Sequence, residues 1–155
     1  MEFFDLMNIS HRYMEILNPS TPEKIIQLGK LLKLKKGGRV IDFGCGCAES
    51  LTLWAEKFGV TGIGIDISKD FCDRANNKLA KRGLSNQIEI VCSSATDYVF
   101  KEGTFDAATC IGATFAFGGF QQAIQALKRA VHQKGRLAIG QTPRLSKQVP
   151  PKYAQ

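Results

Sequence analysis

The most constraining stretch of this 155-residue chain is the segment from Val40 to Ser50, which reads VIDFGCGCAES. An apolar run with β-branched residues leads directly into Gly44 and Gly46, which is typical of a buried strand that ends in a glycine turn. Apolar residues then return at helical spacing, at Leu51, Trp54, Ala55 and Phe58. A strand, a glycine turn and a helix in this order form the ligand-binding unit of doubly wound α/β proteins, so the segment predicts that fold.

The charges beside this turn restrict the ligand. A dinucleotide-binding turn would carry a third glycine where this chain has Glu49, and a carboxylate there repels a pyrophosphate. Asp42, at the end of the strand, adds a second negative charge. Two carboxylates beside a glycine turn suit a ligand that carries an ammonium and a sulfonium group. A nicotinamide-dependent oxidoreductase is therefore the less favoured reading.

At these residues the chain resembles the class I S-adenosylmethionine-dependent methyltransferases, whose first motif has the pattern DxGxGxG. Asp42, Gly44 and Gly46 match this pattern, and Ala48 stands in place of the third glycine. The resemblance implies that S-adenosylmethionine is the cofactor and that Asp42, Gly44, Cys45 and Gly46 contact it. It also implies methyl transfer to a small-molecule acceptor by in-line attack on the sulfonium methyl group.

A second acidic position supports a nucleoside ligand. Residues 62–67 read GIGIDI and predict the second strand, and Asp66 follows Gly46 by twenty residues. At this spacing a strand-end carboxylate reaches the ribose hydroxyls of an adenosine. The alternative role of helix cap is better filled by Ser68. In the resembling family the residue after this carboxylate, here Ile67, packs on the adenine.

The third and fourth strands are predicted at 88–92 and 105–111. Family members commonly place an aspartate and a small residue after the third strand, in contact with the adenine. Here the corresponding pair is Ser94 and Ala95, with Asp97 as an alternative that either reaches the adenine or caps a short turn.

The fourth strand is expected beside the first, at the reversal of strand order where ligands of such sheets bind. The resemblance implies that Cys110 lies on the cofactor side and that Thr114, Phe115 and Phe117 line the acceptor pocket. Core packing of one of these phenylalanines is the alternative. The loop at 112–119 lacks the NPPY-like tetrapeptide of enzymes that methylate amide or exocyclic amino groups.

The chain divides into three predicted parts. Residues 1–20 form a cap segment, which in the resembling family lies over the cofactor site. Tyr13 is therefore a candidate substrate contact and His11 a candidate general base, with a packed tyrosine and a surface histidine as the alternatives. Residues 21–140 form the S-adenosylmethionine-binding domain, and residues 141–155 form an extended basic tail.

The end of the domain departs from the family. We expect a helix over 121–134, stopped by Gly135, and a fifth strand over 136–140, which completes the strand order 3-2-1-4-5. The usual last two strands of the family are missing. The exposed edge strand predicts that the sequence is a piece of a longer protein, or that the tail or a second subunit covers the edge by self-association.

Composition excludes several classes. The sequence contains no run of about 18 apolar residues, so no membrane span is predicted. The five cysteines are spread through strands and helices, which indicates reduced thiols and a cytoplasmic protein, and no metal site is expected. The net charge of +7 allows nucleic-acid binding, but the basic residues are not interleaved with aromatic ones, so RNA is disfavoured. A non-catalytic nucleoside-binding or RNA-associated module remains the main alternative function.

Overall fold

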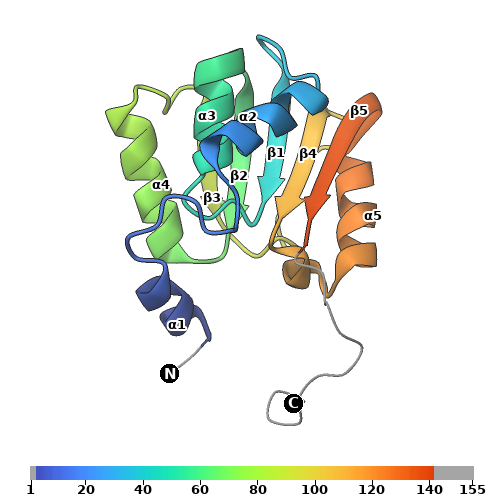
Figure 1. Cartoon of the computed structure of the whole chain (residues 1–155). Coiled ribbons are helices and arrows are strands. Elements are labelled where there is room, and N and C mark those ends of the chain that lie inside the picture. Colours follow the sequence, from blue (N-terminus) through green and yellow to red (C-terminus); the bar gives the residue numbers. More distant parts are fainter. Residues whose placement is uncertain (1–2, 142–155) are drawn as a thin grey trace.

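The computed structural model describes residues 3–141, which form a parallel five-stranded sheet with helices on both faces (Figure 1). The strands are β1 (Arg39–Phe43), β2 (Thr61–Asp66), β3 (Ile88–Cys92), β4 (Phe105–Ile111) and β5 (Val131–Gly140). Their order is β3-β2-β1-β4-β5, and every pairing between neighbours is parallel. The predicted fold class and strand order are confirmed.

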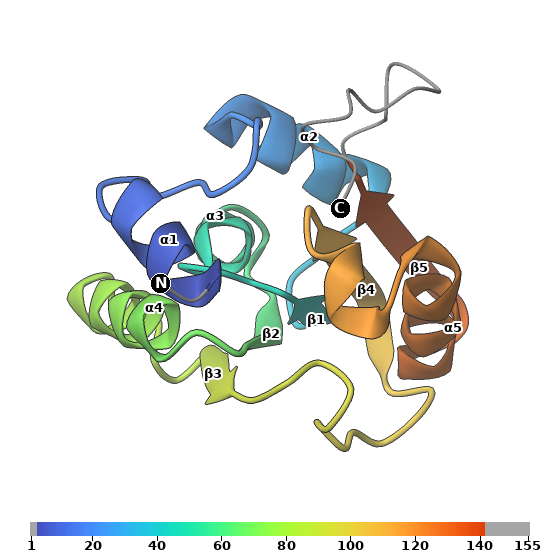
Figure 2. The ribbon, with the colours of Figure 1, turned by 90° about the horizontal axis from the view of Figure 1, so that it is seen from below.

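The helices are α1 (Phe3–Ser10), α2 (Pro22–Leu31), α3 (Glu49–Phe58), α4 (Lys69–Lys81) and α5 (Phe120–Ala130), with a short 3₁₀ helix at Thr114–Phe117. Viewed along the strands, α2, α3 and α4 lie on one side of the sheet and α5 lies on the other, against β4 and β5 (Figure 2). Helix α1 lies beside α4, where Ser68 Oγ donates to Asn8 Oδ1 at 3.0 Å.

Two apolar clusters hold the layers together, because the central strands are buried on both faces. Val40 points into the cluster under α2, α3 and α4, and its neighbour Ile41 points into the cluster under α5. Trp54 is fully buried in the first cluster, and its Nε1–H donates to the carbonyl of Ile25 at 2.8 Å. This bond ties α3 to α2 while satisfying the only polar atom of the indole.

The boundary between α5 and β5 differs from the sequence-based expectation. The helix predicted for 121–134 ends at Ala130, and β5 begins at once with Val131. Val131 pairs with Phe105, and the ladder then resumes only at Arg136, so the intervening residues form a bulge. Gly135 therefore does not stop a helix; a Cβ at that position would lie 2.5 Å from Cβ of Val131.

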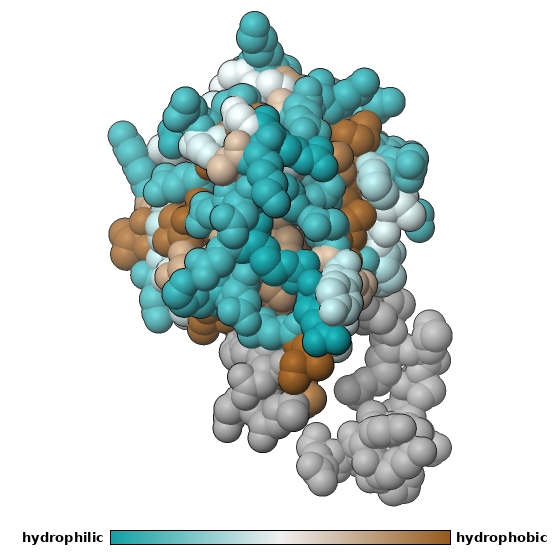
Figure 3. Space-filling model, turned by 90° about the vertical axis from the view of Figure 1, so that its left-hand side faces the viewer, coloured by the Kyte–Doolittle hydropathy of each residue, from teal (hydrophilic) through white to brown (hydrophobic). Residues whose placement is uncertain are grey.

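The outer surface on the α4 side is predominantly hydrophilic (Figure 3). Within residues 3–141, no helix is long and apolar enough to cross a bilayer. All five cysteines are free thiols. The predicted basic tail lies outside the described residues from position 142 onward.

Candidate cofactor site

A cavity of about 340 Å³ opens at the carboxyl ends of the strands. Its walls come from the glycine turn after β1, the end of β2, the segments after β3 and β4, and residues 15–18 from the N-terminal part of the chain. Its position at the reversal of strand order is where open α/β sheets bind their ligands.

The glycine turn is fixed by backbone hydrogen bonds. The N–H groups of Gly44 and Cys45 both donate to the carbonyl of Ile65, at 2.8 and 3.0 Å. Gly44 has φ of +72°, and a Cβ there would lie 2.2 Å from Cβ of Ala113. Glycine is required here because both the backbone conformation and the close approach exclude a side chain.

Asp66 joins this turn to the start of α4. Its Oδ2 accepts a hydrogen bond from the Gly46 N–H at 2.8 Å, and its Oδ1 accepts one from the Ser68 N–H at 2.9 Å. Burial raises the pKa of Asp66, and the backbone N–H groups of Ser68, Gly46 and Ile67 only partly offset that effect. The side chain lines the cavity, so the lone pairs left on both oxygens can accept from ligand hydroxyls.

Several other predicted cofactor residues also line the cavity. They are Gly44, Cys45, Gly46, Ile67, Ser94 and Ala95. Burial raises the pKa of the Cys45 thiol well above its ordinary value, so this wall carries a neutral thiol and no thiolate nucleophile. Asp97 does not line the cavity; its Oδ1 accepts from the Thr96 hydroxyl at 3.2 Å.

Asp42 and Cys110 lie behind the cavity wall instead of facing it. Asp42 is buried beneath the turn, where the Thr109 hydroxyl donates to its Oδ1 at 2.6 Å, and burial raises its pKa to about 7. Cys110 is fully buried in the core cluster under α5. Neither side chain lines the cavity, because Asp42 is bonded to Thr109 and Cys110 packs in the core cluster; their contact with the ligand stays a prediction.

Of the acceptor-pocket residues predicted after β4, only one lines the cavity. Phe115 lines the cavity and is 59% exposed. Thr114 instead donates its hydroxyl to Gln141 Oε1 at 3.1 Å, and Phe117 packs edge-to-face on Phe43 with ring centroids 5.2 Å apart. The 3₁₀ helix turns these two side chains away from the cavity, so the core-packing alternative holds for Phe117.

The two candidate residues of the N-terminal segment, His11 and Tyr13, do not line the cavity either. His11 Nδ1 lies 3.1 Å from the Met7 carbonyl and 2.8 Å from Ser10 Oγ, so its ring packs back onto its own helix. Tyr13 is 85% exposed, and neither side chain lines the cavity. The residues of the predicted cap segment that line the cavity are Met7 and residues 15–18.

Sequence reasoning missed the contribution of residues 15–18 to the cavity. Leu17 packs so closely on the glycine turn that a Cβ at Gly46 would lie 2.6 Å from its Cδ1. No period or motif marks this segment, which runs without regular secondary structure between α1 and α2. The charged side chains among the described lining residues are Glu15, Glu49 and Asp66, all of them acidic.

Comparison with known proteins identifies the family. The family model described as "Methyltransferase domain" matches residues 40–135. The uncharacterized protein YjhP of Escherichia coli (strain K12) is 36% identical over 141 residues, which cover 91% of this chain and 56% of YjhP. The 27-O-demethylrifamycin SV methyltransferase of Amycolatopsis mediterranei is 26% identical over 137 residues, covering 86% of this chain and 50% of that protein.

A solved structure supports the same family assignment. The S-adenosylmethionine-dependent methyltransferase of Geobacter sulfurreducens, crystallised with S-adenosyl-L-homocysteine, superposes with a TM-score of 0.84 at 35% identity. The match covers 95% of this chain and 58% of that one, so the chain spans a little over half the length of the relatives it matches. The chain therefore belongs to the Rossmann-like S-adenosylmethionine-dependent methyltransferases.

Proposed function

We propose that this chain binds S-adenosylmethionine in the cavity at the glycine turn, and that the protein to which it belongs transfers the methyl group to a small-molecule acceptor. The observation that carries the proposal is the charge of the cavity wall. Its charged lining side chains among the described residues are the carboxylates Glu15, Glu49 and Asp66. Lys78 pairs with Glu15 and Glu49 from behind the wall, which leaves the lining acidic overall. An acidic wall favours a cationic ligand over the pyrophosphate of a dinucleotide.

The residues present fit the cofactor. Asp66 offers two carboxylate oxygens to the ribose hydroxyls, and Ile67 and Ala95 provide apolar surface for a purine ring. The glycine turn lets the backbone approach closely, since Gly46 carries no side chain at φ of +55°. The amino-acid part of the ligand would then lie nearer Glu15 and Glu49.

The proposed methyl transfer depends little on a general base. When bound, S-adenosylmethionine supplies an already activated methyl group, so the protein contributes mainly positioning and exclusion of water. The side chains at the cavity mouth, such as Phe115 and Ile111, exclude water and orient an acceptor. His11 points away from the cavity, so we assign no base among the described residues.

A small-molecule acceptor is supported by two observations. The mouth of the cavity beside Phe115 is apolar and open. The relative from Amycolatopsis mediterranei, named for a demethylrifamycin, matches over 86% of this chain. That relative is about twice as long as the matched region.

Calorimetric titration of the chain with S-adenosylmethionine, S-adenosylhomocysteine and NADH tests the proposal. We expect the first two to bind in the micromolar range and NADH not to bind. Equal binding of NADH, or no binding of the first two, would contradict it. Binding of the first two without detectable methyl transfer to a small molecule would favour the non-catalytic alternative.

A further inference from the structure

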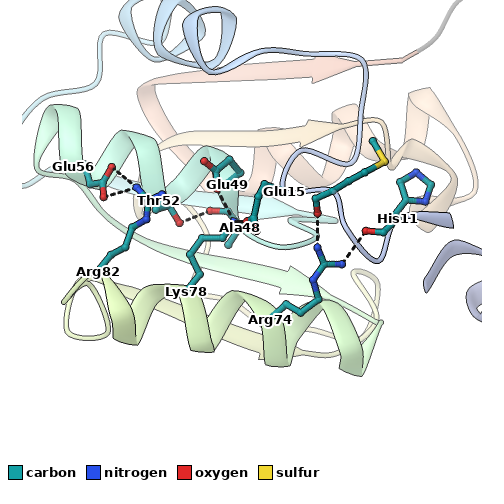
Figure 4. Close-up of polar contacts among 10 residues, drawn as sticks. His11, Glu15, Ala48, Glu49, Thr52, Glu56, Arg74, Lys78 and Arg82 are labelled. Carbon is teal, nitrogen blue, oxygen red and sulfur yellow. Dashed lines mark hydrogen bonds and ion pairs between the residues drawn. The ribbon is translucent and has the colours of Figure 1, made fainter. Parts of the chain in front are cut away.

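Three cations form a row along α4 and its C-cap residue, on the face that meets α3 and the N-terminal segment. Arg74, Lys78 and Arg82 are spaced by four residues, so they lie one above another along the helix (Figure 4). Each contacts a different part of the molecule. We call residues 11–18, which connect α1 toward α2, the strap.

Arg74 holds the strap by its backbone. Its Nη1 donates to the carbonyl of His11 at 3.1 Å, and its Nη2 donates to the carbonyl of Met14 (Figure 4). The planar guanidinium can reach both carbonyls at once, which a lysine ammonium on a flexible stem does less well. These bonds fix the course of the strap whatever its side chains are.

Lys78 joins the strap to α3. Its Nζ pairs with Glu15 of the strap and lies 2.5 Å from Oε2 of Glu49 in the first turn of α3. The side chains of Lys78 and Glu49 are only 11% and 12% exposed. Both carboxylates line the cavity, so without the ammonium between them two negative charges would face each other across its wall.

Beyond these contacts the strap crosses to the glycine turn. Leu17 packs on Gly46, and Cβ of Asn18 lies 3.5 Å from the position of a Cβ on Gly112. Residues 15–18 thus bridge α4 and the loop after β4 and form one wall of the cavity. A ligand bound against the glycine turn lies beneath this wall.

We propose that Arg74 and Lys78 are positioning residues that latch the strap over the cofactor cavity, so that entry and release of the nucleoside ligand require these contacts to break. This inference rests on the proposed function for the identity of the ligand. Arg82 is the matched control, since it pairs with Glu56 of α3 and its charge acts on Glu15 of the strap only as a minor, longer-range effect.

The test compares Arg74→Gln and Lys78→Met with Arg82→Gln, which removes the third cation of the same row, at the C-cap of α4. We measure association and dissociation rates of S-adenosylhomocysteine by surface plasmon resonance. Both latch variants should release the ligand at least about tenfold faster, because a tenfold change corresponds to about 1.4 kcal/mol, within the range of one charged hydrogen bond. Arg82→Gln should keep the rate within about twofold.

A ligand-independent measurement separates the latch from the proposed function. Hydrogen exchange of the strap amides in the ligand-free protein should rise in both latch variants and stay unchanged in Arg82→Gln. If S-adenosylhomocysteine fails to bind the unmodified protein, the proposed function fails, while the exchange data still decide whether the latch exists. Unchanged strap exchange in both latch variants overturns the latch.

Rescue variants distinguish positioning from a general loss of stability. Lys78→Arg should restore slow release, since it keeps a cation between Glu15 and Glu49. In the Lys78→Met background, Glu15→Gln should recover part of the slow release by removing one of the two facing charges. An equal acceleration in Arg82→Gln, or no recovery in either rescue variant, would contradict the assignment.

Discussion

The two walls of the cavity, the glycine turn and the strap, are held in different ways. The turn is held by backbone hydrogen bonds from Gly44 and Cys45 to the neighbouring strand. The strap has no sheet or helix of its own and depends on the side chains of Arg74 and Lys78. The turn can therefore move only if β1 and β2 separate, whereas the strap can be displaced while the sheet stays folded.

The carboxylates of the two walls also differ in what shifts their pKa values. Burial raises the pKa of Asp42 and of Asp66, beneath and beside the turn. The Lys78 ammonium instead lowers the pKa of Glu15 on the strap. Burial dominates where the fold encloses the acid, and a partner charge dominates where the acid lies near the surface.

The largest expected effect is the pH dependence of stability at Asp42. Its folded pKa of about 7 lies above the unfolded value, so its favourable contribution is fully present below about pH 4 and is lost as pH rises to about 7. A difference of about 3 pKa units corresponds to about 4 kcal/mol. Asp42→Asn should remove this loss, because the amide oxygen still accepts from Thr109. Urea unfolding from pH 4 to 8 measures it.

Glu15→Gln is the matched comparison from the strap, and its pH dependence has the opposite sign. The lowered pKa of Glu15 means that its contribution is present above the unfolded value and lost as pH falls through the folded one. Difference curves for Asp42→Asn and Glu15→Gln should therefore slope in opposite directions. Parallel curves would show that the two walls are not distinguished by their electrostatics.

Replacing Asp66 is expected to have the next largest effect. Asp66→Ala removes both carboxylate oxygens offered to the ribose and releases the Gly46 N–H. We expect the Kd for S-adenosylhomocysteine to rise about 100-fold, or about 2.7 kcal/mol, in calorimetry. Ser68→Ala is the control, because it removes the α4 cap hydroxyl but keeps the N–H bonded to Asp66. Unchanged affinity in Asp66→Ala would remove the ribose assignment.

Gly46→Ala tests whether the two walls act on each other. Residue 46 has φ of +55°, which costs an alanine about 1 kcal/mol, and its Cβ would lie 2.6 Å from Leu17. We expect the strap to shift, its amide exchange to rise, and affinity to fall about fivefold. Adding Leu17→Ala to Gly46→Ala should bring the amide exchange of the strap back toward that of Leu17→Ala alone. If Gly46→Ala leaves the strap exchange unchanged, the two walls are independent.

The smallest effect is expected at Arg82. Arg82 and Glu56 form an ion pair at 2.9 Å whose side chains are 44% and 38% exposed. Arg82→Gln should lower the free energy of unfolding by less than about 1 kcal/mol, as is usual for exposed pairs. Thermal unfolding at low salt measures the change, and a larger loss would mean that the whole cation row of α4 supports the fold.

The glycine turn and its acidic partner were predictable because short sequence patterns define them. The apolar run before Gly44 and the distance from Gly46 to Asp66 identified the turn and its acidic partner. The burial of Asp42 and the choice between pocket and core for Phe117 could not be read from the sequence, because strand and 3₁₀ geometry decide which way a side chain points. The end of α5 was misplaced because the bulge in β5 depends on pairing with β4.

By itself, the sequence determined the strands along the chain, the glycine turn and the acidic residue at the end of β2, because periodicity and short spacings are properties of neighbouring residues. The order of the strands in the sheet followed from the resemblance to the family. Only the tertiary structure decided that Asp42 is buried and that the strap closes the cavity. Arg74 and His11 lie 63 residues apart in sequence, and nothing local links them. Their contact exists because the packing of α4 beside α1 and the sheet brings the two segments together, and packing is a property of the whole chain.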